Sequence, residues 1–349
     1  MKVLALTEGP SHVCYRYRLA PFAAALQERG WTLESLPLST RPLVRSSQLR
    51  EAAQADLVVL QRRLLPLWQL RLLRSAARRL IYDFDDALFC RDSYSTKAAP
   101  SWTRLARFWA TIYAADGVVA GNQFLCAQAG QYIDPAKVQF IPTCVDPANY
   151  NLARHERRGA AVRLGWIGQR STLPCLYHAE RLLVAAAEAL PGLRLRVICD
   201  RYPQLLGVRV VPRTWSGATE SEELADLDIG ISWLPDDEWS RGKCGLKVLQ
   251  YMAAGLPVVA NPVGENATMV RHGETGFLAS TPEEWASAIA RLAHDPELRA
   301  RMGTAGREHL ERHYHVHRWS HTFAEFVDRL GRPSLPVDRL GTAAMERIG

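Results

Sequence analysis

The stretch RGKCGLKVLQYMAAGLPVVANPVG, Arg241 to Gly264, decides the fold class of this chain of 349 residues. It predicts a polar loop, a helix that begins near Gly245, a break at residues 255–257, a buried strand and a second loop closed by glycine. Strands and helices alternate in this way along the rest of the chain. That alternation is typical of parallel sheets whose strands are joined by helical crossovers.

One face of the predicted helix is cationic. At about 100° per residue, Lys243, Lys247, Gln250 and Tyr251 share a face, and the opposite face is apolar. The free N–H groups of a first helical turn attract anions, so two ammonium groups beside them suit a phosphate ester. A solvated helix face that happens to carry two lysines is the alternative interpretation.

The run GLKVLQYMAAGLPVVANPVG resembles the donor-binding segment of retaining, nucleotide-sugar-dependent glycosyltransferases of the GT-B fold, family 4, also called glycosyl transferases group 1. That family has a Gly-rich helix start followed by an E-[AS]-M-A-[AS]-G-x-P-V-V unit. The resemblance implies an α/β protein with two doubly wound, Rossmann-like domains that face each other across a cleft. Two glutamates that the family spaces eight apart fall here at Gly242 and Gln250, so this chain resembles a divergent member that lacks the usual pair.

The segment IPTCVDPANYN, Ile141 to Asn151, resembles the hinge by which the family passes from its first domain to its second, with Cys144 in place of a glycine. We therefore expect an N-terminal acceptor-binding domain over residues 1–148 and a C-terminal donor-binding domain over residues 149–314. Residues 315–349 are expected to form a helix that crosses back to the first domain. Ligands in such folds bind at the carboxyl ends of the strands.

The donor site follows from the resemblance and from the cationic helix together. Gly9 matches a glycine that lets backbone approach the donor diphosphate, and Arg170 lies one place from the usual arginine. The usual lysine after Gly168 is missing, so Lys243 and Lys247 are the expected replacements for its charge. Gln250 can hold ribose hydroxyls through its amide. The expected donor-binding residues are Gly9, Gly168, Arg170, Lys243, Gly245, Lys247 and Gln250.

Three carboxylates, Asp83, Asp85 and Asp86, lie at the carboxyl end of the apolar strand in IYDFDDALF. Many family members carry a His-Asp pair near this point, and Tyr82 falls closest to that histidine. We expect the three aspartates to perform acid/base catalysis or to orient the acceptor hydroxyl. Clustered carboxylates repel one another, so one of them has a raised pKa or is tied to an arginine. A capping role in the following helix is the alternative for one of the three.

Arg16 and Arg18 stand at the start of the first predicted helix. Their guanidinium groups can bind a phosphate or an anionic acceptor in bidentate fashion. Ion pairs with Glu8 and Glu28 are the alternative.

The net charge is +7, from 43 basic and 36 acidic residues, and the excess gathers between residues 42 and 80. Within this region the basic stretch Arg62–Arg79 is amphipathic. A surface helix that packs its Leu stripe on the sheet is the simpler interpretation, and attachment to an anionic membrane surface is the other. Nucleic acid is not an expected partner, because no known binding module accompanies the charge.

Seven scattered cysteines and a start that reads as a strand, MKVLALT, favour a cytoplasmic protein with reduced thiols over a secreted one. His317 and His321 are an i,i+4 pair without an acidic third ligand at the usual spacing, and GT-B enzymes seldom need a metal. We therefore expect no metal and no cofactor beyond a UDP- or GDP-sugar co-substrate.

Together these features predict a glycosyltransferase of the hexosyltransferase type that moves a sugar from a nucleotide diphosphate to a glycan, a lipid-linked acceptor or another precursor of cell-surface polysaccharide. It would work in the cytoplasm or at the inner face of the plasma membrane. Because Gly242 cannot act as a glutamate, two alternatives stay open. One is a GT-B-fold module that binds nucleotide sugars without transfer, and the other is a nucleotide-sugar epimerase on the same fold.

Overall fold

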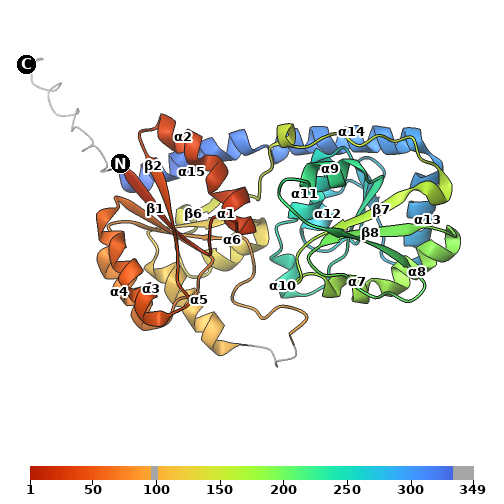
Figure 1. Cartoon of the computed structure of the whole chain (residues 1–349). Helices are drawn as coiled ribbons and strands as arrows, with labels where there is room; N and C mark the ends of the chain where they lie inside the picture. Colours follow the sequence, from red (N-terminus) through yellow and green to blue (C-terminus); the bar gives the residue numbers. More distant parts are fainter. Residues whose placement is uncertain (96–100, 333–349) are drawn as a thin grey trace, which may run out of the picture.

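The protein consists of two α/β domains that lie side by side (Figure 1). The structure is a computed structural model that describes residues 1–95 and 101–332. Each domain has a six-stranded parallel sheet with helices on both faces, as expected for two doubly wound, Rossmann-like units. The prediction of the fold class is therefore confirmed.

The first sheet has the strand order β2-β1-β3-β4-β5-β6, with its switch point between β1 and β3. Helices α3 to α6 cover one face, and α2 and α15 cover the other. The strands are β1 (Lys2–Thr7), β2 (Thr32–Pro37), β3 (Leu57–Gln61), β4 (Leu80–Phe84), β5 (Gly117–Ala120) and β6 (Val138–Phe140). The helices are α1 (Val13–Arg18), α2 (Ala23–Glu28), α3 (Pro42–Arg50), α4 (Leu67–Ala76), α5 (Trp102–Ala114) and α6 (Gln123–Gly130).

The second sheet has the order β12-β11-β10-β7-β8-β9, with its switch point between β7 and β10. Its strands are β7 (Arg163–Ile167), β8 (Arg194–Cys199), β9 (Arg209–Thr214), β10 (Ile229–Ser232), β11 (Val258–Ala260) and β12 (Gly276–Leu278). Its helices are α7 (Pro174–His178), α8 (Glu180–Ala189), α9 (Glu220–Ala225), α10 (Glu238–Arg241), α11 (Leu246–Ala253), α12 (Glu265–Met269), α13 (Pro282–His294) and α14 (Pro296–His313).

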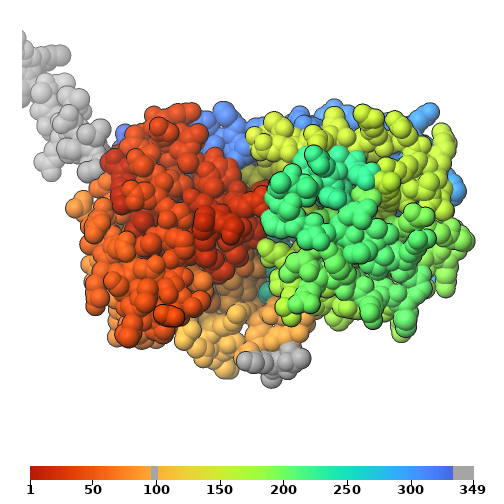
Figure 2. All heavy atoms as spheres, in the orientation of Figure 1, coloured from red at the N-terminus to blue at the C-terminus, as the bar shows by residue number. Residues whose placement is uncertain are grey.

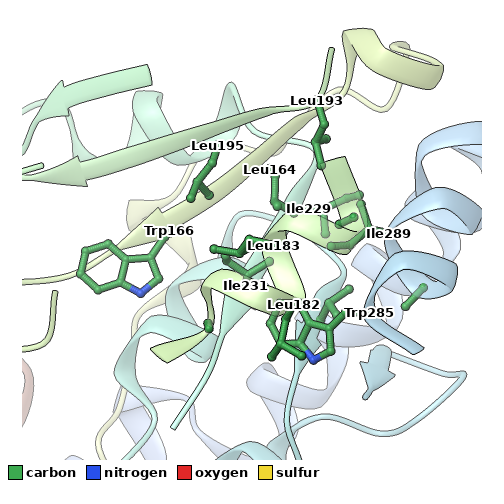
Figure 3. Packing of buried hydrophobic residues seen from close by; sticks show 14 of the residues in the cluster. Leu164, Trp166, Leu182, Leu183, Leu193, Leu195, Ile229, Ile231, Trp285 and Ile289 are labelled. Carbon is green, nitrogen blue, oxygen red and sulfur yellow. The ribbon is translucent and has the colours of Figure 1, made fainter. Parts of the chain in front are cut away.

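The core of the second domain lies between its sheet and helices α8 and α13 (Figure 3). Trp166 on β7 and Trp285 on α13 are both fully buried there. On the other face, the Tyr251 ring of α11 lies where a Cβ at Gly230 would be, only 2.4 Å from that position. Glycine in β10 therefore lets α11 pack directly on the strand.

Helix α15 (Val316–Gly331) leaves the second domain and packs on the first. Its Phe323 and Phe326 share a core cluster with Phe22 and Trp31, and the Trp31 Nε1 donates a hydrogen bond of 2.6 Å to Asp328. The expected boundary at residues 148/149 falls between β6 and β7 and stays a prediction. Residues 333–349 of the expected crossing segment lie outside the described residues.

Across residues 1–95 and 101–332, no helix combines the length and the apolar composition that a bilayer span requires.

Candidate active site between the two domains

The N-terminus of α11 lies at the interface between the domains, where the sequence places the phosphate site. Gly245 precedes the helix in the left-handed conformation, with φ of 64°, and a Cβ there would lie 2.6 Å from the Met269 Sδ. A larger residue here would be strained at this φ and would displace the end of the Met269 side chain. The N–H groups of Val248 and Leu249 donate to the carbonyl of Gly245, whereas those of Leu246 and Lys247 have no acceptor within the described residues and are available to an anion.

Lys247 stands in this first turn with its charge uncompensated. Its Nζ lies 4.4 Å from the centroid of the buried Trp166 ring, and no carboxylate of the described chain pairs with it. Burial lowers the pKa of Lys247, Cys175 raises it, and Lys243 lowers it. Because the Trp166 ring carries no charge, the Lys247 ammonium group is free to bind an anionic ligand.

Lys243 links the two domains. Its Nζ donates a hydrogen bond of 3.0 Å to Asp86 and lies 3.5 Å from the centroid of the Trp239 ring. The same loop docks on the end of β5, where the Asn122 Nδ2 donates to the carbonyl of Arg241 at 2.9 Å. The predicted donor lysine and the predicted catalytic aspartate are therefore brought together.

Arg62 organises the two aspartates. Its guanidinium donates to Asp85 at 2.6 Å and to Asp86 at 2.8 Å. Burial raises the pKa of Asp85, but Arg62 and Arg18 outweigh this effect and hold it at about 2. Among the residues that the structure describes, Arg62 is the one non-glycine with a positive φ, 60°, a strained conformation that surroundings must maintain.

Within the basic stretch Arg62–Arg79, Leu70 and Leu73 of α4 are buried, as expected for a helix that packs a Leu stripe on the sheet, but its arginines have different environments. Arg62 points into the site, Arg74 pairs with Asp116 at 2.9 Å, and Arg78 pairs with Asp56 at 3.3 Å. Arg79 donates to the carbonyl of Leu330 on α15. Arg62 was missed as a site residue, although its position directly after a buried strand was the same signal that singled out Asp85.

Arg18 and Asp83 form an ion pair beneath the site. The Arg18 Nη2 donates to Asp83 at 2.6 Å, its Nη1 donates to the carbonyl of Ile141 at 2.9 Å, and the Gln61 Nε2 also donates to Asp83 at 2.9 Å. Both charged side chains are 1% exposed. Arg18 is therefore not accessible to an acceptor in this arrangement, and Asp83 is not accessible to a substrate.

Gln250 lies at a second meeting point of the domains, around the buried carboxylate of Glu220. Four side chains donate hydrogen bonds to this carboxylate: Tyr17 at 2.7 Å, Trp215 at 2.8 Å, Tyr150 at 2.9 Å and Gln250 at 2.9 Å. The amide group that was expected to hold ribose thus already holds Glu220. Glu220 was missed because three of its four partners, Tyr17, Tyr150 and Gln250, lie far from it in the sequence.

Arg16 lies beside this network. Its guanidinium is 5.5 Å from the Trp215 ring and 5.4 Å from the Tyr17 ring, and no acidic partner for it occurs in the described parts of the chain. The alternative of an ion pair with Glu8 or Glu28 is therefore not what the structure shows. Arg16 remains open to an anionic ligand.

The remaining predicted residues follow the strands as expected. Gly9 follows β1 with φ of 147°, and nothing lies within 4 Å of a Cβ there. Gly168 follows β7, where a Cβ would lie 2.4 Å from the Trp166 ring. Arg170 is exposed and has no ion-pair partner within the described residues.

Two positions that depart from the family pattern are now explained. Tyr82 is fully buried and stacks on Phe84 at 5.3 Å, facing the core rather than the site. A Cβ at Gly242 would lie 2.6 Å from the Cβ of Ala87 and 2.7 Å from its backbone nitrogen. A glutamate at this position therefore has no room while the domains are in contact.

His12, in the loop after β1, is a further candidate that was not assigned. Its Nε2 lies 3.2 Å from Glu8, and its Nδ1 accepts from the Cys14 N–H at 3.3 Å. Burial lowers the pKa of His12, against the effect of Glu8, with Arg62 and Asp85 also within electrostatic reach. A neutral imidazole thus lies near the paired aspartates.

Within the described chain, no three His, Cys, Asp or Glu side chains converge in a way that suits a metal ion. His317 and His321 do contact each other, with 3.3 Å between their Nε2 atoms.

Comparisons with known proteins agree with this architecture. The family model described as Glycosyl transferase-like matches residues 170–325. The D-inositol 3-phosphate glycosyltransferase of Stackebrandtia nassauensis is 36% identical over 224 residues, which cover 57% of this chain and 49% of that protein. The chain spans about half the length of the curated relatives it matches.

Two solved structures resemble the whole chain. Sucrose-phosphate synthase from Thermosynechococcus elongatus superposes with a TM-score of 0.72 at 16% identity, covering 95% of this chain and 99% of that one. HepE from Anabaena, solved with UDP and glucose, superposes with a TM-score of 0.68 at 16% identity, covering 95% of this chain and 100% of that one. The chain therefore has the GT-B fold, and residues 170–325, which span most of its second domain and part of α15, match the Glycosyl transferase-like family.

Proposed function

We propose that this protein is a glycosyltransferase that moves a sugar, with retention, from a nucleotide-diphosphate sugar to a glycan or lipid-linked acceptor. The observation that carries the proposal is the uncompensated charge of Lys247 above the first turn of α11. Burying a charge without a partner is costly, so such a site indicates a ligand of opposite charge. A diphosphate fits both the ammonium group and the free N–H groups.

The chemistry of the donor side would be electrostatic. Lys247, Lys243 and the α11 N-terminus would neutralise the diphosphate as it leaves, with Arg170 at the rim of the site. Lys243 now pairs with Asp86, so a bound diphosphate would compete with that aspartate for the ammonium group. Contact between the domains would exclude water from the reacting atoms.

On the acceptor side, the aspartates and His12 would have different roles, orientation of the acceptor hydroxyl and proton transfer. A carboxylate with a pKa of about 2 is a weak base, so Asp85 suits orientation of the acceptor hydroxyl more than proton transfer. Neutral His12 is the stronger base of the two, and it would accept the proton at Nδ1 in exchange for the 3.3 Å hydrogen bond that this atom accepts from the Cys14 N–H. Arg16 would contact an anionic part of either substrate.

A UDP- or GDP-sugar is the donor class we propose. The relative from Stackebrandtia is named as a glycosyltransferase for an inositol phosphate, and the solved HepE neighbour holds UDP and glucose. An acceptor from polysaccharide biosynthesis and work in the cytoplasm, at or near the inner membrane surface, belong to the same proposal.

A thermal-shift screen across UDP-, GDP-, ADP- and dTDP-sugars tests the donor class, because a ligand that binds the native state raises its stability. The proposal expects one nucleotide series to raise the midpoint and its sugar to be transferred when extracts supply acceptors. If no nucleotide diphosphate raises the midpoint, the assignment of the donor site is refuted.

A second candidate is a GT-B-fold module that binds nucleotide sugars without transferring them. It is favoured by the lack of room for a glutamate at Gly242 and by the engagement of Gln250 with Glu220. The module would bind the donor with neither transfer nor hydrolysis. An epimerase, the third class, would instead convert the donor when no acceptor is present.

A further inference from the structure

Helices α3, α4 and α5 form a basic layer on one face of the first domain (Figure 1). Helix α3 packs against α4, and α4 packs against α5. Their sequences, PLVRSSQLR, LWQLRLLRSA and WTRLARFWATIYA, contain no acidic residue. Their arginines are Arg45, Arg50, Arg71, Arg74, Arg104 and Arg107.

Large apolar side chains stand exposed on the same three helices. Leu43 on α3 is 84% exposed, Trp68 on α4 is 55% exposed, and Trp102 on α5 is 70% exposed. Each lies in the first turn of its helix. In a parallel α/β domain those turns lie at the carboxyl edge of the sheet, which is the edge that holds Asp85 and Asp86.

Uncompensated positive charge lies between these side chains. Arg45 donates hydrogen bonds to neutral groups, the Gln69 side chain and the carbonyl of Ser39. The pKa of Arg45 is lowered by burial and then by Arg63 and Arg107, and of these three arginines Arg63 alone has an acidic partner in the described chain, Glu8 at 3.6 Å. In the described chain neither Arg107 nor the exposed Arg71 has an acidic partner.

We propose that this face, defined by Leu43, Arg45, Trp68, Arg71, Trp102 and Arg107, docks on an anionic phospholipid bilayer. Tryptophan prefers the boundary between headgroups and acyl chains, and arginine binds lipid phosphates. A bilayer also matches the extent of a face that spans three helices. This face takes only Trp68 and Arg71 from the basic stretch Arg62–Arg79, because Arg62 is internal and Arg74 and Arg78 are paired with acids.

This orientation would place the carboxyl edge of the first sheet next to the membrane surface. A lipid-linked acceptor could then reach Asp85 and Asp86 without leaving the bilayer, a consequence that rests on the proposed function. The docking itself does not depend on catalysis.

Flotation of the full chain with phosphatidylcholine vesicles, with and without phosphatidylglycerol, tests the proposal. The protein is expected to float only with anionic vesicles and to detach at about 1 M salt, where the screening length falls to about 3 Å. Arg71→Gln with Arg107→Gln should weaken partitioning about five-fold for each arginine removed. Trp68→Ala with Trp102→Ala should also weaken it and leave the remaining binding more sensitive to salt.

Arg301→Ala and Tyr177→Ala are matched controls, because both side chains are exposed on the second domain. They should float like the parent chain. Absence of flotation at low salt, or equal flotation of the double variants and the controls, would overturn the proposal. A vesicle-free dimer that Trp68→Ala dissociates would also overturn it, because a second copy of the chain would then cover this face. Nucleotide affinity, measured on the same samples, separates these results from a failure of the donor site.

Discussion

Lys247 is the side chain whose charge most needs a ligand. Lys247→Ala is expected to weaken binding of UDP or GDP by about 1.5–3 kcal/mol, as for a hydrogen bond to a charged group. Isothermal titration calorimetry measures this directly. Lys137→Ala, which removes an exposed lysine from the first domain, is the control and should bind as the parent does. Equal affinity of all three proteins would exclude a phosphate role for Lys247.

The acceptor-side residues should affect turnover rather than donor affinity. Asp85→Asn, Asp86→Asn and His12→Ala are each expected to lower kcat by about 10²–10⁴-fold, the range of a general acid–base or orienting group. Calorimetry with the nucleotide should give affinities no weaker than that of the parent. If all three variants keep full turnover, Asp85, Asp86 and His12 have structural roles and do not contribute to catalysis.

Asp83 should behave differently from its two neighbours, because it neutralises the buried Arg18. Asp83→Asn leaves that guanidinium without a counter-charge and is expected to cost about 3–5 kcal/mol of unfolding free energy. Urea denaturation measures the loss, with Asp85→Asn as the more exposed comparison. If Asp83→Asn is as stable as the parent but has impaired turnover, Asp83 acts in catalysis and its role is not structural.

The sequence located those site residues that directly follow a buried strand or begin a helix. Asp85, Asp86 and Lys247 fall in this class, because chain direction alone places them at the carboxyl edge. Their partners were not predictable in the same way. Arg62 was grouped with a basic segment by local composition, although its backbone turns it inward. Glu220 gathers donors from residues 17, 150, 215 and 250, which no local pattern connects.

Helix α12 carries a residue, Glu265, that is expected to make the folding stability of the protein depend on pH. Burial raises the pKa of Glu265 in its first turn from 4.5 to about 7, and no hydrogen-bond partner for this carboxylate occurs among the described residues. The folded state therefore holds a proton that the unfolded state has released. The associated stability is fully present below about pH 4.5 and is lost as the pH rises through about 7.

Glu265→Gln is expected to remove this loss, because the amide stays neutral. Above about pH 8 the variant should be more stable than the parent by on the order of 1–3 kcal/mol, while near pH 4 the two should be alike. Thermal or urea unfolding across that range gives the comparison. A difference between the two proteins that does not change with pH would show that Glu265 is already ionised in the folded protein.

The order of the helices and strands was predictable because both sheets are parallel and buried on both faces, so their strands read as short apolar runs. The placement of α11 was predictable in the same way, from Gly245 before it and Gly255 after it. The close approach of α11 to β10 at Gly230 was not, because it depends on one ring and one missing Cβ.

For the chain as a whole, several polar links join the domains in addition to α15. Among them, Lys243 reaches Asp86, Asn122 reaches the carbonyl of Arg241, and Tyr17 reaches Glu220. The space-filling view shows the two domains in contact along their shared side (Figure 2). The resemblance of one segment to a known family implied two facing domains, but it did not give these contacts, since they join residues far apart in sequence.

A crystal structure of the protein with bound UDP or GDP, chosen by the nucleotide screen, tests the donor site most directly. We expect the diphosphate to lie at the first turn of α11, in contact with its N–H groups and with the Lys247 Nζ. We also expect Lys243 to move from Asp86 toward the ligand. A nucleotide whose diphosphate binds elsewhere, with Lys247 still resting on Trp166 alone, would contradict the proposed donor site.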